Sequence, residues 1–318
     1  MLSQIRITDE DRSAVRALLF EIGRDSSNLE ENSFLERATL LAQDLPIGIR
    51  KAFYEFKFRE SAVGLLITNN PILPEDVGPT PQSHWRSGER RPLSLPQLMH
   101  GLYSSLLGEV FGFETQQNGR IFNDLIPVRG ERDNSSSGAG NIGLHTEDCF
   151  QPFMPDYLGL MCLRNDERAV TTFSSLWQVA IPQNVIAVLF EDRFVAKKHA
   201  TNPDTKMSSP RFSILFGDPK RPYLRYGSVS FDECTSDMLS AMRFISTALE
   251  QNRRDITLAQ GDCLYLDNFF AVHGRAAYRP KYGPEGRWFS RLVMTRDLRK
   301  TRTFRARPDA RIMLKNIY

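Results

Sequence analysis

The sequence contains little cysteine, no long apolar run and almost no net charge. Its cysteines, Cys149, Cys162, Cys234 and Cys263, are scattered singly and lack the Cys-x-x-Cys spacing of a zinc or redox motif, which favours reduced thiols over disulfides. No window approaches the roughly 20 apolar residues that a membrane helix needs, and the N-terminal residues lack the apolar segment of a signal peptide. These absences predict a cytosolic protein.

The charge balance gives little reason to expect an acidic partner. Lys and Arg number 41 against 38 Asp and Glu, a net charge of +3 that requires neither nucleic acid nor an acidic membrane. Basic residues do gather near the C-terminus: Arg296, Arg299, Lys300, Arg302, Arg305, Arg307 and Arg311. They leave open a nucleic-acid or regulatory binding protein, although a solvated terminal segment is the commoner explanation.

The length and composition are typical of one large globular domain. With 318 residues, 41% of them hydrophobic and 25% charged, the chain can bury a sizeable core. We expect residues 1–112 to be largely helical, residues 113–298 to form a β-rich core with a helical insert near residues 235–252, and residues 299–318 to form a basic tail.

Apolar spacing predicts helices first and strands later. Thr8 with Asp11 resembles a helix start, Ser33 precedes a second helical stretch, and a third helix carries Leu98, Leu102, Leu106 and Val110. Residues 61–68 resemble a buried strand and residues 71–91 a loop. Short apolar runs then recur between turn signals, at residues 121–127, 157–163, 170–177, 212–216, 223–226, 263–266 and 288–295. Such a series favours a sandwich or barrel.

The most informative motif is His145-Thr146-Glu147, followed far along the chain by His273. In an extended segment His145 and Glu147 point to the same side, and a distant imidazole can complete a three-point face. Two histidines and one carboxylate are typical of a non-haem Fe(II) site with open positions. A His-x-Glu motif alone often arises by chance, and a zinc hydrolase could use the same three ligands.

The arginines after His273 favour the oxygenase over the hydrolase. The chain has Arg275 and Arg279, and then Arg287 and Arg291 on either side of a short apolar strand. Because the rigid guanidinium fork suits carboxylates, 2-oxoglutarate and an amino-acid carboxylate are natural partners. A hydrolase has no reason to place such arginines behind its last metal ligand.

Several motifs then occur in the order of a known family, over roughly residues 111–298. They are Gln116-Gln117-Asn118-Gly119-Arg120, Leu144-His145-Thr146-Glu147-Asp148, Leu163-Arg164-Asn165, Thr171-Thr172, Pro222-Tyr223-Leu224-Arg225-Tyr226 and the segment from His273 to Arg291. The chain resembles the clavaminate synthase-like Fe(II)/2-oxoglutarate-dependent oxygenases, in particular hydroxylases of free amino acids of the arginine and asparagine type. The resemblance implies a mainly β fold with flanking helices and a distorted double-stranded β-helix core, also called a jelly roll and cupin-like.

The resemblance also implies roles for individual residues. His145, Glu147 and His273 would hold iron. Arg287 would bind the distal carboxylate of 2-oxoglutarate, with Thr172, or less favourably Thr171, as its hydroxyl partner.

Substrate contacts are implied in the same way. Arg291 would pair with the α-carboxylate, Gln117 or its neighbour Gln116 would contact the amine together with Glu147, and the loop containing Ser135 would cover the site.

The reaction implied is hydroxylation of a free amino acid at Cβ or Cγ, with O₂ and 2-oxoglutarate consumed and succinate and CO₂ released. Glu147 occupies the position that a halogenase leaves vacant for halide, which disfavours halogenation. Desaturation and oxidative cyclisation remain alternatives because the same iron chemistry serves all three. The resemblance suggests a place in antibiotic or other specialised metabolism.

One departure concerns the substrate side chain. Relatives that act on arginine-like substrates tend to have an acidic residue where this chain has Tyr226-Gly227-Ser228, although Asp232 and Glu233 follow shortly after. We expect the polar residues Asp148, Asp156 and His199 to be satisfied by surrounding protein rather than to contact the substrate.

Overall fold

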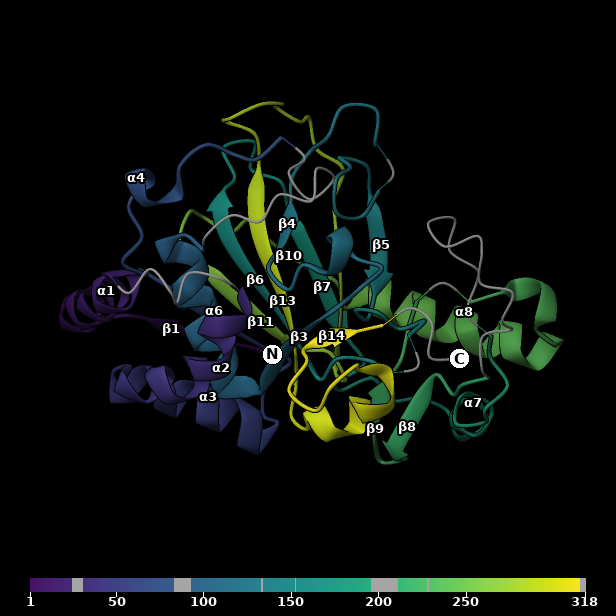
Figure 1. Cartoon of the computed structure of the whole chain (residues 1–318). Coiled ribbons are helices and arrows are strands. Elements are labelled where there is room, and N and C mark those ends of the chain that lie inside the picture. The colour runs from purple at the N-terminus through teal and green to yellow at the C-terminus, as the bar shows by residue number, and fades with distance from the viewer. Residues whose placement is uncertain are drawn as a thin grey trace.

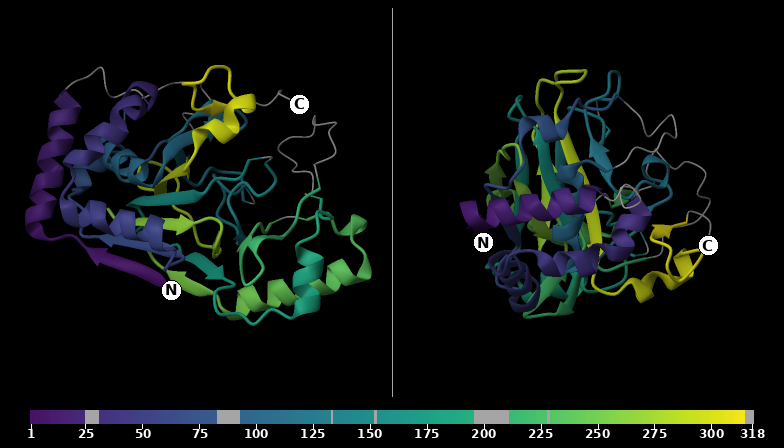
Figure 2. Two further views of the ribbon diagram at one scale, coloured as in Figure 1. Left: turned by 90° about the horizontal axis from the view of Figure 1, so that it is seen from below. Right: turned by 60° about the vertical axis from the view of Figure 1, so that its left-hand side comes forward.

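The structure is a computed structural model, and it describes residues 1–24, 31–82, 93–132, 134–151, 153–195, 211–227 and 229–314. Figure 1 shows four layers: N-terminal helices on the left, two β-sheets in the middle, and the pair α7 and α8 on the right. Figure 2 shows the same layers from two other sides. Helices therefore cover the outer face of each sheet and leave the space between the sheets for the site.

The N-terminal layer packs against the outer face of the larger sheet. Its elements are α1 (Asp9–Arg24), α2 (Glu31–Leu41), η2 (Ala42–Asp44), α3 (Ile47–Arg59), α4 (Pro74–Val77) and α6 (Leu95–Leu107). As the sequence predicts, the Thr8 hydroxyl accepts a hydrogen bond from the Asp11 backbone N–H at the start of α1, at 3.1 Å. One buried cluster joins these helices to the sheet through Phe34, Phe53, Tyr103 and Tyr265.

Within the described residues, the larger sheet has eight strands in the order β1-β2-β11-β6-β13-β3-β14, with β4 paired to β13. Their bounds are β1 Leu2–Arg6, β2 Gly64–Thr68, β3 Glu109–Phe113, β4 Asn123–Leu125, β6 Tyr157–Arg164, β11 Cys263–Asp267, β13 Trp288–Thr295 and β14 Ile312–Met313. The central strands β6, β11 and β13 are almost fully buried, as expected for strands covered on both faces.

The smaller sheet has four described strands in the order β10-β7-β12-β5. They are β5 Ile142–His145, β7 Thr171–Ser175, β10 Arg254–Ile256 and β12 Ala271–Arg275. A hairpin of β8 (Leu215–Asp218) and β9 (Arg221–Leu224), the helices α7 (Gln183–Leu189) and α8 (Ser236–Gln251), and short 3-10 turns at η3 (Gln117–Gly119), η4 (Phe231–Glu233) and η5 (Leu298–Phe304) complete the fold.

Alternation along the smaller sheet separates an inner face from an outer face. Ala271 and Phe173 belong to the cluster between the two sheets. Val272 belongs to the cluster beneath α8, and the Ser174 hydroxyl donates to the Leu249 carbonyl of α8 at 2.6 Å. Every second residue of β7 and β12 therefore faces the site.

Most expected elements are present, and three expectations need correction. The fold is a mixture of helix and sheet rather than mainly β. Val110 lies in β3, because α6 ends at Leu107. The third correction concerns the C-terminal residues: Arg305 is buried and donates to the carbonyls of Leu298 and Ala310, while β14 pairs with β3. The described part of this segment packs on the domain through Arg305 and β14, while Arg299, Lys300, Arg302 and Arg307 are exposed to solvent.

Two expectations drawn from absences can be compared with the structure. All four cysteines are free in the structure. Within the described residues, no helix combines the length and apolar character required to cross a membrane.

Close packing of α6 against its neighbours gives a testable consequence. A Cβ at Gly101 would lie 2.5 Å from Phe34 Cε1 and 3.0 Å from Phe122 Cζ, both buried rings. We expect Gly101→Ala to lower the free energy of unfolding by about 1–3 kcal/mol despite its better helix propensity. Gly48→Ala is the control, because its Cβ would meet only Asp11 Oδ2 at 3.8 Å and should leave stability unchanged or raise it by up to about 1 kcal/mol. Urea denaturation measures both, and an equal effect of the two substitutions would contradict this packing argument.

Candidate active site

Among the described residues, one group of side chains could hold a metal ion: His145, Glu147 and His273. One ligand atom from each lies within 4.8 Å of the others. His145 ends β5 and stands opposite His273 of the neighbouring strand β12, and their ring centroids are 4.4 Å apart. Glu147 follows β5, and its Oε2 lies 3.3 Å from His273 Nε2. The structure thus brings together the three residues that the sequence singles out.

The protonation states suit a metal cation. Desolvation, and then the neighbouring His273, lower the pKa of His145 to about 4, so this imidazole is neutral at physiological pH. Burial acts to raise the pKa of Glu147, but Arg291 and then His273 outweigh it and hold that pKa well below its usual range. A metal ligand must be a neutral imidazole or an ionised carboxylate, and both conditions hold here.

Hydrogen bonds to neighbouring groups orient His145 and Glu147. The Gly143 carbonyl accepts a hydrogen bond from Nδ1 of His145 at 2.9 Å, which leaves Nε2 for a metal. Asn268, which the sequence did not single out, accepts from the Glu147 backbone N–H at 2.7 Å and donates to the Glu147 carbonyl at 3.1 Å and the Pro155 carbonyl at 2.9 Å. This buried amide fixes the turn that presents the carboxylate.

Arg291 of β13 reaches across from the larger sheet. Its Nη1 donates to Glu147 Oε1 at 2.8 Å, and its Nη2 donates to Gln116 Oε1 at 2.7 Å and to Asn123. The guanidinium expected to bind a substrate carboxylate therefore lies beside the candidate metal ligands.

The structure also distinguishes between two adjacent glutamines. The resemblance favours Gln117 as the amine contact, but the Gln117 side chain accepts from the Asp124 backbone N–H and donates to its carbonyl, at 2.9 and 2.8 Å. Gln116 instead contacts Arg291 and donates to Asp148 Oδ1 at 2.6 Å. The geometry favours Gln116 at the site.

Asp148 lies within this network and not at the surface. Its backbone has the left-handed φ of 51°, and its Oδ2 is buried without a hydrogen-bond partner. Burial and, next, the charge of Glu147 raise the pKa of Asp148 to about 7. We interpret Asp148 as a residue that holds Gln116 in place.

The candidate anion site lies on the same inner face. Arg287 is buried, with its Cζ 4.0 Å from the Phe289 ring centroid. In the register of β7 and β12, Thr171 is opposite Arg275 and Thr172 is opposite Gly274. Thr172 therefore shares the outer face with Ser174, and a Cβ on Gly274 would lie 2.9 Å from the Thr172 hydroxyl. The register favours Thr171 instead of Thr172 as the hydroxyl on the inner face.

The loop before β5 is held by its own hydrogen bonds. Asn134 Oδ1 accepts from the backbone N–H groups of Ser136 and Ser137, and the Ser137 hydroxyl bonds to Glu131. Ser135 is exposed at the turn, so its substrate contact stays a prediction.

The segment after Leu224 packs against the metal-binding turn. Thr146 and Tyr226 exchange hydrogen bonds, and a Cβ on Gly227 would collide with Cys149 Sγ. Asp232 and Glu233 are exposed on η4, which gives no support to their replacing the missing acidic residue.

Two further polar candidates can be placed or set aside. Asp156 accepts from the Arg296 backbone N–H at 2.7 Å and has the structural role expected of it. Ser228 and His199 lie outside the described residues.

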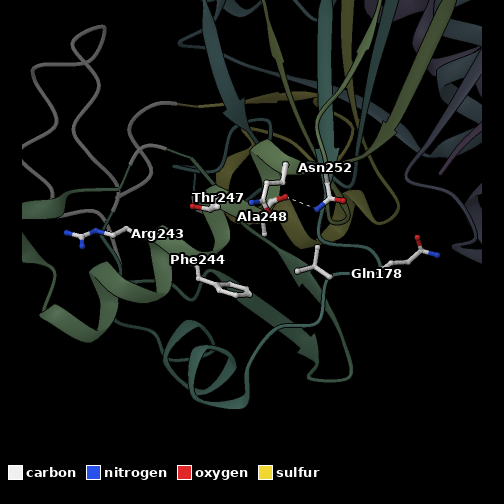
Figure 3. Close-up of a pocket in the computed structure, with 8 residues that line it drawn as sticks. Gln178, Arg243, Phe244, Thr247, Ala248 and Asn252 are labelled. Carbon is white, nitrogen blue, oxygen red and sulfur yellow. Dashed lines mark hydrogen bonds between the residues drawn. The ribbon is translucent and has the colours of Figure 1, made fainter.

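Two surface cavities lie apart from His145, Glu147 and His273. One, of about 430 Å³, is formed by α8 and the segment after β7, as Figure 3 shows, and its lining residues are Gln178, Val179, Arg243, Phe244, Thr247, Ala248, Gln251 and Asn252. The other, of about 220 Å³, is lined by Glu60, Asp156, Tyr157, Tyr223, Asp267, Phe269, Arg296 and Lys300. Neither contains a member of the triad.

Comparison with known proteins places this site in a family. The chain matches no protein-family model. It is 29% identical to the L-ornithine/L-arginine 3-hydroxylase of Catenulispora acidiphila, over 98% of this chain and 100% of that one. It is 28% identical to clavaminate synthase 2 of Streptomyces clavuligerus, over 84% of each chain.

A solved structure gives a closer comparison. The non-haem iron oxygenase OrfP, in complex with Fe, succinate and (3R,4R)-dihydroxy-L-Arg, superimposes with a TM-score of 0.89 at 30% identity, over 98% of this chain and 99% of that one. Another OrfP structure contains Fe and alpha-ketoglutaric acid. The chain belongs to the clavaminate synthase-like family of Fe(II)/2-oxoglutarate-dependent oxygenases. Its fold is the cupin-like fold of non-haem iron oxygenases, and the family excludes the hydrolase alternative.

Asn268 provides a prediction about the metal site. We expect Asn268→Ala to weaken Mn(II) or Fe(II) affinity by about 10–100-fold, because the turn that carries Glu147 loses its support. Asn165→Ala is a matched control: Asn165 is also buried, accepts one backbone N–H and donates to two carbonyls, but it lies between Ala169 and Leu258. Both substitutions should lower stability, whereas only Asn268→Ala should weaken metal binding. Unchanged metal affinity in Asn268→Ala would contradict this role.

Proposed function

We propose that this protein hydroxylates a free amino acid, at Cβ or Cγ, with Fe(II), 2-oxoglutarate and O₂. The proposal rests on one observation: the side chains of His145, Glu147 and His273 lie together, and Glu147 is paired with Arg291. A second buried arginine, Arg287, lies on the same inner face. Relatives named as hydroxylases of arginine, ornithine and lysine, and one named as an asparagine oxygenase, support it.

The donor set of the triad fits iron. Two imidazoles and one ionised carboxylate are the donor set of non-haem Fe(II) sites that keep positions open for other ligands. When bound, iron and 2-oxoglutarate supply the oxidising chemistry, in which O₂ and 2-oxoglutarate are converted to succinate and CO₂ and one oxygen atom enters the substrate. The remaining task of the protein is to place a particular C–H bond next to this centre.

Arg291 and Gln116 are placed to hold the backbone of the substrate. A free α-carboxylate can accept two parallel hydrogen bonds from the Arg291 guanidinium, and the Gln116 amide oxygen lies 2.7 Å from Arg291 Nη2. With the carboxylate and the amine held at the ligand triad, Cβ and Cγ are the carbons nearest the metal. This positioning explains why the proposed product is modified close to its backbone.

Arg287 and Thr171 are placed to hold 2-oxoglutarate. Arg287 is buried on the inner side of β13, and Thr171 faces the same space from β7. Because a carboxylate bound there neutralises a buried charge, this end of the pocket favours a dicarboxylate.

We further infer that the two sheets are the distorted double-stranded β-helix of the family. Their arrangement face to face, with His145 and His273 on the smaller sheet and Arg291 on the larger, supports this interpretation. The loop of residues 134–140, including Ser135, would cover the bound substrate.

The first prediction is that free L-amino acids stimulate succinate formation. A panel of them, assayed with Fe(II) and 2-oxoglutarate, should give one substrate that gains a single oxygen atom by mass spectrometry. His145→Ala should abolish turnover. Arg291→Ala should lower kcat/KM for the amino acid by at least about 100-fold, since a charge-assisted bidentate contact is lost.

Arg299→Ala is the control, because Arg299 pairs with Asp297 at the surface. A product lighter by two hydrogen atoms would move the assignment to desaturation or cyclisation. No stimulation by any amino acid would refute the free amino acid as substrate.

The second prediction separates the two neighbouring threonines. Thr171→Val should raise the KM for 2-oxoglutarate by about 5–30-fold through loss of one hydrogen bond, whereas Thr172→Val should leave this KM unchanged. Steady-state kinetics with 2-oxoglutarate as the varied substrate measure both. A larger effect of Thr172→Val would contradict the assignment of faces.

A further inference from the structure

Two buried guanidinium groups share one aromatic ring on the inner face. Arg275 ends β12 and Arg287 comes just before β13, and their exposed fractions are 5% and 4%. The Tyr278 ring centroid lies 5.3 Å from Cζ of Arg275 and 5.6 Å from Cζ of Arg287. Strands of opposite sheets thus place two like charges close together and away from water.

The protein itself leaves these charges largely unmatched. Among the described residues, neither guanidinium forms an ion pair, and Arg275 Nε, Arg287 Nε and Arg287 Nη1 are buried without hydrogen-bond partners. Glu167 Oε1 accepts hydrogen bonds from the backbone N–H groups of Lys281 and Arg287 and not from the Arg287 guanidinium. The charge of Glu167 therefore acts on this guanidinium only from a distance. Burying an unpaired charge is costly, so such a pair indicates a site for an anion.

Another arginine of the same chain shows the contrast. Arg305 is also 4% exposed and also lacks an ion pair among the described residues, but its guanidinium donates to the Thr301 hydroxyl and to the carbonyls of Leu298 and Ala310. Burial of an arginine in this protein therefore does not by itself leave the guanidinium unsatisfied. Buried nitrogens without hydrogen-bond partners also occur in Arg12, Arg120 and Arg311, but each of these arginines forms an ion pair. Among the described residues, Arg275 and Arg287 combine such nitrogens with the lack of an ion pair.

Arg275 also contacts the loop before β5. Its Nη2 donates to the Gly140 carbonyl at 3.1 Å, and the Tyr278 backbone N–H donates to the Ala139 carbonyl at 3.1 Å. Arg275 is two residues after His273 in β12, so its side chain leaves the strand on the side of the candidate metal ligand. The Arg275 side chain therefore lies between β12, which carries His273, the candidate anion site at Arg287, and the loop of residues 134–140.

We propose that Arg275 is a second guanidinium of the 2-oxoglutarate site and that its bond to Gly140 couples binding of this dicarboxylate to the ordering of residues 134–140. The inference rests on the proposed function and adds a residue to it. The distal carboxylate has two oxygens, and the unsatisfied donors of Arg275 and Arg287 can serve both. With its charge neutralised, Arg275 is held in the position from which it bonds Gly140.

The experiment measures binding directly, without turnover. Mn(II) replaces Fe(II), and calorimetry gives the dissociation constant of 2-oxoglutarate for the unmodified protein, Arg275→Gln and Arg275→Lys. We expect a loss of about 10–100-fold in Arg275→Gln and a smaller loss in Arg275→Lys, which keeps the charge but not the fork. Hydrogen exchange of the amides of residues 134–140 should slow on addition of 2-oxoglutarate to the unmodified protein, and not in Arg275→Gln.

Arg305→Gln is the matched control: it removes a buried arginine from the C-terminal segment and should leave 2-oxoglutarate affinity unchanged. Equal affinities of the unmodified protein and both Arg275 variants would overturn the inference while the proposed function stands. Failure of the unmodified protein to bind 2-oxoglutarate with Mn(II) would overturn both. Lost affinity in Arg275→Gln with loop protection retained would overturn the coupling.

Discussion

Glu147 places an ionised carboxylate in the space between two sheets, where an isolated charge would be very unfavourable. Arg291 comes from the larger sheet, the imidazole of His273 from the smaller one, and Asn268 holds the backbone on either side of the carboxylate. The low pKa of this group is therefore a product of the assembled fold. The position of Arg291 and the ionised state of Glu147 depend on each other, because the two charges neutralise each other.

The layered architecture makes such a site possible. Helices bury the outer faces of both sheets, so the inner faces can present polar groups without losing the hydrophobic contacts that stabilise the domain. His145 and His273 lie on paired strands and not on loops, which fixes the separation of their rings. Segments outside the two sheets complete the surroundings of the site. Tyr226 and Gly227, for example, pack beside the turn that carries Glu147.

The three buried arginines of the inner face differ in whether they have a protein carboxylate as a partner. Arg291 has the carboxylate of Glu147 as a partner, whereas Arg287 and Arg275 have no carboxylate partner among the described residues. A guanidinium without a protein carboxylate has its whole charge available to an anionic ligand, whereas Arg291 would share its charge between Glu147 and the proposed substrate carboxylate. This difference distinguishes the arginine proposed to bind the amino acid from those proposed to bind the dicarboxylate.

The sequence by itself predicted the ligand triad and the arginines after His273. These predictions rest on patterns that can be followed along the chain: the alternation of side chains in a strand, and motifs that occur in the order of a known family. The sequence also predicts six of the twelve described strands of the two sheets, which are β2, β4, β6, β7, β11 and β13, and the limits of α8. It missed α3, whose apolar residues include the exposed Ile47, Tyr54 and Phe58, so that helical periodicity is obscured. Tertiary contacts distinguish Gln116, which bonds to Arg291, from Gln117, which bonds to the Asp124 backbone. The register of β7 with β12 places Thr171 and Thr172 on opposite faces of the smaller sheet, which the sequence alone does not show. The contacts of Asn268 and Arg275 arise between segments more than 100 residues apart, which no local pattern encodes.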